Sequence, residues 1–169
     1  AAPAPTPRTL VAPSRVAIAA AGGIPVLVGV LKTYGATIEK VAAGGCGAMS
    51  NLISGSEINN ADNRRVIVAI GGILVLVEVF KIHGPTNSTV AMMVCSALGN
   101  LAFHAANRVT IADAGGIPVI VSVVQTQGLT NAKVAELGCF VLRNLAINNQ
   151  NNKESIRDAN GIKVVKEMK

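Results

Sequence analysis

A pair of turn residues, Gly-Gly in three cases and Asn-Gly in the fourth, recurs along the chain at nearly constant spacing. The second residues of the pairs are Gly23, Gly72, Gly116 and Gly161, so the steps are 49, 44 and 45 residues. Similar apolar stretches follow the pairs, such as IPVLV and IPVIV. A period of roughly 20–50 residues is typical of repeat architectures. One repeat cannot bury its own apolar face, so we expect neighbouring repeats to stack on a continuous core.

Further positions recur in register with these pairs. Each of three repeats has a Val, a Cys five residues later and an Asn ten residues later, while a Gly stands six residues before the Val. The Cys positions are Cys46, Cys95 and Cys139, and the Asn positions are Asn51, Asn100 and Asn144. All variation in repeat length falls after the Asn. Residues 54–65 carry about five extra residues, and we expect this insertion in an exposed connection.

The pattern predicts three helices in each repeat. In the third repeat these are a short helix over 107–114, an apolar helix over 117–127 and a long helix over 131–147. The Gly pair separates the first two helices, because Gly readily takes the left-handed conformation found at helix ends. Strands are the alternative for the Val/Ile stretches, since β-branched residues favour strands locally. The absence of period-two alternation favours helices.

Composition argues against several classes of function. The net charge is +6, but the basic residues are scattered and only 2% of residues are aromatic. A nucleic-acid interface would show clustered charge with stacking aromatics, so we expect no nucleic-acid partner. The uncharged run 16–31 is too short to span a bilayer and holds a Gly-Gly-Ile-Pro turn, so we expect no membrane span. An odd number of cysteines, without CxxC spacing, predicts neither a disulfide framework nor a zinc site.

An enzymatic site is not predicted. The three cysteines lie on apolar helices, and the two histidines, His83 and His104, do not recur with them. The Gly pairs lack the Lys-Ser/Thr of a phosphate-binding loop and occur four times. We therefore expect no catalytic residue, cofactor or metal, and the reduced cysteines favour a cytoplasmic location, with a nuclear one also open.

The order Asn-Leu-Ala, Asn-Arg, Gly-Gly-Ile-Pro, apolar run, Gly and long helix resembles the armadillo repeat, most closely over 100–140. The resemblance covers residues 14–169. It implies an all-α, right-handed α-solenoid of three-helix repeats, with full units at about 14–62, 63–106 and 107–151 and a partial fourth at 152–169. The Pro-rich segment 1–13 is expected to be a linker or arm.

In armadillo proteins the third helices line a concave groove that binds extended partner segments. The resemblance assigns contact with the partner backbone to Asn51, Asn100 and Asn144, because a side-chain amide matches one peptide unit. The alternative role for these residues is a cap or an inter-repeat hydrogen bond. Importin-α has a Trp one turn before the Asn, where this chain has Gly47, Ser96 and Phe140. Its mode of cargo recognition is therefore not expected here. The other candidate groove residues are Met92, His104, Glu136 and Arg143.

Two functions follow as hypotheses. The first is a protein-interaction module that binds an extended or helical protein segment in the groove. The second is a structural segment of a larger cytoskeletal or ciliary assembly without a dedicated groove. Because the last unit is partial, we also expect either a fragment of a longer array or an open C-terminal end covered by a partner or a second copy.

Overall fold

The computed structural model describes residues 15–55 and 58–160, and these residues form helices joined by short turns, with no strand among them. Residues 15–20 are helical. The helices that follow are α2 (Gly23–Tyr34), α3 (Glu39–Ile53), α4 (Ile58–Ala69), α5 (Gly72–His83), α6 (Ser88–Leu101), α7 (Ala105–Asp113), α8 (Gly116–Gln127), α9 (Ala132–Ala146) and α10 (Gln150–Asp158). The helical interpretation of the Val/Ile stretches is therefore confirmed.

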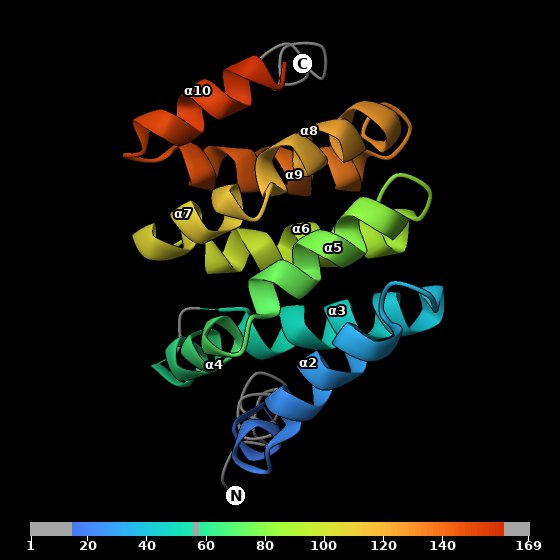
Figure 1. Cartoon of the computed structure of the whole chain (residues 1–169), viewed down its shortest axis with the longest axis vertical. Helices are drawn as coiled ribbons and strands as arrows, with labels where there is room; N and C mark the ends of the chain where they lie inside the picture. The colour runs from blue at the N-terminus through green and yellow to red at the C-terminus, as the bar shows by residue number, and fades with distance from the viewer. Residues whose placement is uncertain (1–14, 56–57, 161–169) are drawn as a thin grey trace, which may run out of the picture.

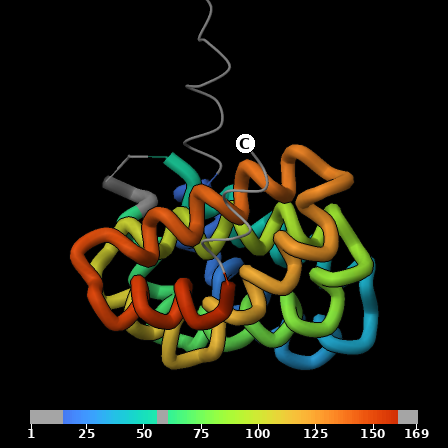
Figure 2. Tube along the Cα trace, turned by 90° about the horizontal axis from the view of Figure 1, so that it is seen from above, coloured from blue at the N-terminus to red at the C-terminus, as the bar shows by residue number. Residues whose placement is uncertain are grey.

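Equivalent helices lie side by side in rows. The apolar helices α2, α5 and α8 form one row, and the long helices α3, α6 and α9 form the row behind it (Figure 1). Viewed along the stack, successive turns of the chain lie over one another around a shared outline (Figure 2). This arrangement is that of a helical repeat protein and is consistent with an α-solenoid.

The Gly pairs set the angle between consecutive helices. The first residue of each pair has a positive φ, which is 78° at Gly22, 81° at Gly71 and 76° at Gly115. L side chains rarely adopt this conformation, so Gly stands there in three pairs, while the fourth pair has Asn160 with a φ of 61°. The chain consequently bends by 76° between α4 and α5 and by 77° between α7 and α8. The predicted helix breaks at these pairs are confirmed.

The insertion after the first long helix is only partly a connection. We expected the whole of 54–65 to be loop, but α4 already begins at Ile58. It has 12 residues, whereas α7 and α10 have nine each. The extra residues therefore lengthen a helix as well as a turn. The predicted loop at 147–153 is likewise short, because α10 begins at Gln150 after the capping residue Asn149.

Aliphatic side chains fill the core. Val, Ile and Leu dominate it, and Phe80 is its one buried aromatic side chain among the described residues. Close helix packing replaces aromatic bulk, since Gly45 lies against Leu31 and Gly138 lies against Val124. The expected arm over 1–13 and the apolar end of the partial fourth unit lie outside the described residues.

The length and apolar character of the helices bear on whether the chain could span a membrane. Within 15–55 and 58–160, no single helix is long and apolar enough to cross a bilayer. Two bent helix pairs, 61–83 and 105–127, reach the required length and composition only when their two members are taken together.

Candidate partner-binding face

One stripe of each long helix is exposed or half-buried, and the three stripes lie next to one another because α3 packs on α6 and α6 on α9. We name this surface the third-helix face. Its members are Lys40, Gly44, Gly47, Asn51, Thr89, Met92, Ser96, Asn100, Lys133, Glu136, Phe140 and Arg143. The predicted groove residues on α6 and α9 thus share one surface, apart from the buried Asn144.

The three repeated asparagines do not have equivalent surroundings. Asn144 is 1% exposed, and its Nδ2 donates to the carbonyl oxygen of Gly99 on α6 at 3.2 Å. Asn51 is exposed and Asn100 half-buried. Among the described residues, neither of these two amides has a hydrogen bond. Asn144 therefore holds one long helix to the next, while Asn51 and Asn100 keep amides free to bind another chain.

We call the packing of α2 and α3 against α5 and α6 the first junction, and that of α5 and α6 against α8 and α9 the second. At the first junction the long helices meet through small and polar groups. The Ser50 hydroxyl donates to the Ser96 hydroxyl at 2.8 Å, and Gly47 lies beside Met93. Ser96 is therefore half-buried and engaged between helices.

At the second junction the long helices meet through an aromatic ring. Phe140 of α9 packs directly on Gly99 of α6, where any larger residue would collide with the ring. Phe103 approaches Phe140 edge-to-face, with ring centroids 5.9 Å apart, and the Arg143 guanidinium lies 5.6 Å from the Phe140 ring centroid. Phe103 is 55% exposed. We call these three side chains the Phe-Arg cluster.

The remaining predicted residues are spread more widely. Glu136 forms an exposed ion pair with Lys133 at 2.8 Å. Met92 is half-buried against the core. His104 is exposed, but it precedes α7 as its capping residue rather than lying on a long helix. His104 is therefore not part of the stripe, although it follows Phe103 directly in the chain.

The Asn-Arg motif has a structural role. The Nδ2 atoms of Asn63, Asn107 and Asn152 donate to the carbonyls of Leu52, Leu101 and Leu145, at 2.9, 2.9 and 3.0 Å. Each bond closes the end of a long helix, whose last carbonyls lack partners within the helix. The arginines act beside them.

Arg108 shows the full pattern for the arginine. Its guanidinium donates backward to the Ala102 and Phe103 carbonyls, at 2.8 and 3.1 Å, and forward to the Ile147 carbonyl of the next repeat at 2.8 Å. One guanidinium thus joins the ends of two successive long helices.

The cysteine thiols are poorly suited to act as nucleophiles. Burial raises the pKa of Cys46 to about 12. Burial, and to a lesser extent nearby Cys139, raises the pKa of Cys95 to about 12. The pKa of half-buried Cys139 is also raised by burial. The thiolate is the reactive form, so these thiols are weakly reactive at neutral pH. Within the described residues, no three His, Cys, Asp or Glu side chains group to hold a metal.

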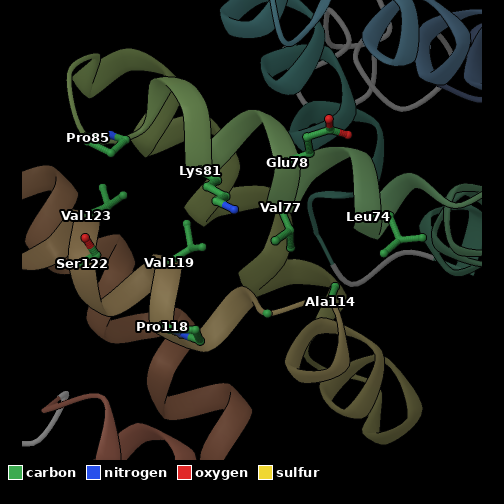
Figure 3. Close-up of a pocket in the computed structure, with 11 residues that line it drawn as sticks. Leu74, Val77, Glu78, Lys81, Pro85, Ala114, Pro118, Val119, Ser122 and Val123 are labelled. Atoms are coloured by element: carbon green, nitrogen blue, oxygen red, sulfur yellow. The ribbon is translucent and has the colours of Figure 1, made fainter.

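A hollow of about 860 Å³ lies between α5 and α8, away from the third-helix face (Figure 3). Val77 and Lys81 of α5 face Val119 and Ser122 of α8 across it. The corresponding lysine of the first junction, Lys32, reaches across and donates to the Ile70 carbonyl at 3.0 Å.

Lys81 behaves differently from Lys32. In the described part of the chain, the Lys81 ammonium has neither an ion pair nor a hydrogen bond. The second junction therefore stays open on the α5–α8 side, whereas a lysine bridges the first.

Phe103 is the member of the Phe-Arg cluster that sequence reasoning missed. It lies three residues after Asn100, where the other repeats have Ser54 and Ile147. In a chain with three Phe and one Tyr, this aromatic substitution at a repeated position was an available signal.

A scan against models of protein families and a search of curated proteins each gave no match. Solved structures do match. One is the crystal structure of an engineered protein from the Northeast Structural Genomics Consortium, with a TM-score of 0.73 and 30% sequence identity. The alignment covers 90% of this chain and 57% of that one, so this chain spans less than two thirds of the engineered protein. The match agrees with the helical-repeat fold.

Proposed function

We propose that this chain is an armadillo-type protein-interaction module that binds a partner segment on the third-helix face, with the Phe-Arg cluster as its anchor. The proposal includes the three-helix unit and the right-handed solenoid that the sequence pattern implies. The recurring helix order, the positive-φ glycines and the Asn bonds at the long-helix ends support that assignment.

The observation that carries the proposal is the position of the aromatic residues. Phe80 lies in the core, whereas Phe103 and Phe140 meet at the surface with Arg143 over one ring. Aromatic and Arg side chains dominate the binding energy of protein interfaces, usually as a few central anchors. A rigid ring pair also loses little conformational entropy on binding.

The neighbouring amide supplies the polar part of the site. Asn100 lies one turn before Phe103 and is half-buried with a free amide. It can donate to and accept from one peptide unit of an extended chain. Asn144, which the resemblance assigns to the same task, is committed to Gly99. The proposed polar contacts are therefore Asn100 and Asn51.

The test starts from peptides selected on the immobilised chain from a random displayed library. Their affinities are then measured for the wild type and for Phe103→Ala, Arg143→Ala and Asn100→Ala. We expect Phe103→Ala to weaken binding by roughly tenfold or more, as for an anchor residue. Asn100→Ala should weaken binding with unchanged helicity in circular dichroism.

Leu129→Ala is the matched control, because Leu129 is also a large exposed apolar residue but lies in the turn after α8. The selected peptides should bind Leu129→Ala with the same affinity as the wild type. The proposal would be overturned if the selected peptides bound all three variants of the third-helix face with the same affinity as the wild type. Failure to enrich any peptide would favour the alternative, a structural segment of a cytoskeletal or ciliary assembly.

A further inference from the structure

The outward side of α2, at the start of the described array, carries apolar residues whose equivalents in α5 are buried. Val26 is 67% exposed, whereas the equivalent Val75 of α5 is 5% exposed. Val30 is 37% exposed, whereas the equivalent Val79 is 1% exposed and packs against Gly35 of the preceding repeat. In α5 the preceding repeat covers these positions, whereas in α8 the equivalent of Val26, Val119, is half-buried.

The same end has an unfilled hollow of about 470 Å³. Ile18, Leu27 and Ala48 form its apolar lining, and Arg15 and Asn51 contribute polar groups. The equivalents of Leu27 and Ala48 in the next repeat, Leu76 and Ala97, are fully buried. We call this surface, together with Val26 and Val30, the N-terminal face.

Arg15 indicates which kind of group this face can bind. It makes the forward bond of its series, from Nη1 to the Ser54 carbonyl at 3.0 Å. Arg108, at the equivalent position, also donates Nε and Nη2 to the last carbonyls of the preceding long helix. Among the described residues, no acceptor meets Nε or Nη2 of Arg15. The guanidinium thus retains the donors that elsewhere bind a helix C-terminus.

The polar groups at this face are the Arg15 guanidinium and the Asn51 amide. Asn51 is exposed and lines the hollow. An α-helix end with free carbonyls carries partial negative charge, which a guanidinium complements.

We propose that the N-terminal face binds the C-terminal turns of an amphipathic α-helix supplied by another protein. The apolar side of that helix lies on Val26, Val30 and Leu27, and its last carbonyls accept from Arg15. This surface adjoins the third-helix face at Asn51 and would join this chain end-on to a helical partner. The apolar packing and the guanidinium–carbonyl bonds would be of the same kind as those at the junctions within the stack.

The probe is a labelled peptide of residues 131–149 with Cys139→Ser, which contains an amphipathic long helix and its C-terminal end. Fluorescence anisotropy measures its binding to the full chain. We expect saturable binding that Val26→Asp weakens by roughly tenfold or more, because a carboxylate would be buried unpaired. Arg15→Gln should weaken binding less, by roughly threefold, in keeping with one exposed charged contact.

Leu74→Asp is the matched control, because Leu74 is 60% exposed but belongs to the α5–α8 hollow. Phe103→Ala separates this site from the third-helix face. Both should bind the peptide as the wild type does, and circular dichroism should show every variant folded.

Three results would overturn the proposal. The first is absent binding, or binding that Val26→Asp leaves unchanged. The second is binding that appears only after residues 1–14 are removed, which would assign the face to the chain's own N-terminal segment. The third is a dimer in sedimentation that Val26→Asp dissociates, which would assign the face to a second copy.

Discussion

The two junctions of the stack share one backbone pattern and differ in chemistry. The first is held by a Ser50–Ser96 hydrogen bond and a Lys32 bridge to a backbone carbonyl. The second is held by Phe140 on Gly99 and by the buried Asn144 amide. An exposed aromatic cluster and an open hollow accompany the second junction. Repeated geometry therefore fixes the stack, while substitutions at a few junction positions give each junction its own surface chemistry.

The largest expected difference concerns the repeated Asn. Asn144→Ala leaves the Gly99 carbonyl without its buried partner, so we expect a loss of about 1–3 kcal/mol in the free energy of unfolding. Asn100→Ala removes no internal hydrogen bond and should change stability by about 0.5 kcal/mol or less. Urea unfolding measures both. Equal losses would mean that the two junctions use their asparagines alike.

The small residues should also respond in opposite directions. A Cβ on Gly99 would lie 2.5 Å from the Phe140 ring, so Gly99→Ala should destabilise the chain by about 1–2 kcal/mol. A Cβ on Gly47 would lie 3.4 Å from the Met93 sulfur, which is an ordinary contact. Gly47→Ala should therefore stabilise α3 by up to about 1 kcal/mol. Thermal and urea unfolding of the pair decide this, and a stabilising Gly99→Ala would contradict it.

Because the thiols are buried, the free energy of unfolding should fall at alkaline pH. The ordinary thiol pKa is 9.0, and in the folded chain that of Cys46 and Cys95 is about 12. Between these values the folded state keeps protons that the unfolded state has lost, so stability falls as pH rises above about 9 and is intact below it. The loss is about 1.4 kcal/mol per thiol and pH unit.

Comparing the free energy of unfolding of the wild type and Cys46→Ala at about pH 8 and about pH 10 gives the contribution of one thiol. The contributions of the other titrating groups are the same in both proteins and cancel in the difference. The variant should lose less stability on going to the higher pH. In the same samples, iodoacetamide at neutral pH should modify half-buried Cys139 before Cys46 and Cys95. Rapid labelling of all three in the folded chain would revive a catalytic interpretation.

The smallest effect should come from the two lysines. Lys32→Met removes a surface bond to the Ile70 carbonyl and should cost about 0.5 kcal/mol. Lys81→Met removes no partner and should be neutral within error. Urea midpoints of the two variants give the comparison. If both lose stability equally, Lys81 has a structural contact in solution and the α5–α8 hollow is not open there.

Sequence reasoning predicted the repeated part of this structure well. The Gly pairs marked the helix breaks, and the predicted helix over 117–127 corresponds to α8 at Gly116–Gln127. Such boundaries are encoded locally, by residues that permit a positive φ or prevent helix continuation.

The departures from the repeat were harder to predict. The insertion became additional helix in α4 because its residues, unlike those of a Gly/Pro-rich loop, do not forbid helix. The different roles of Asn100 and Asn144 depend on which long helix lies beside each, and neither helix is close in sequence. Phe103 acquires importance only because Phe140 reaches it across the second junction.

The bends at the Gly pairs bear on how regularly the long helices are spaced along the stack. Their angles, 76° and 77°, agree although the side chains around them differ. The orientations of α5 and α8 are therefore set by backbone conformation and are nearly independent of the surrounding side chains. Under the proposed function, an array with more such repeats would present its long helices at constant intervals, so the length of the partner segment that it binds would grow in proportion to repeat number. Specificity can then be changed one repeat at a time without altering that scale.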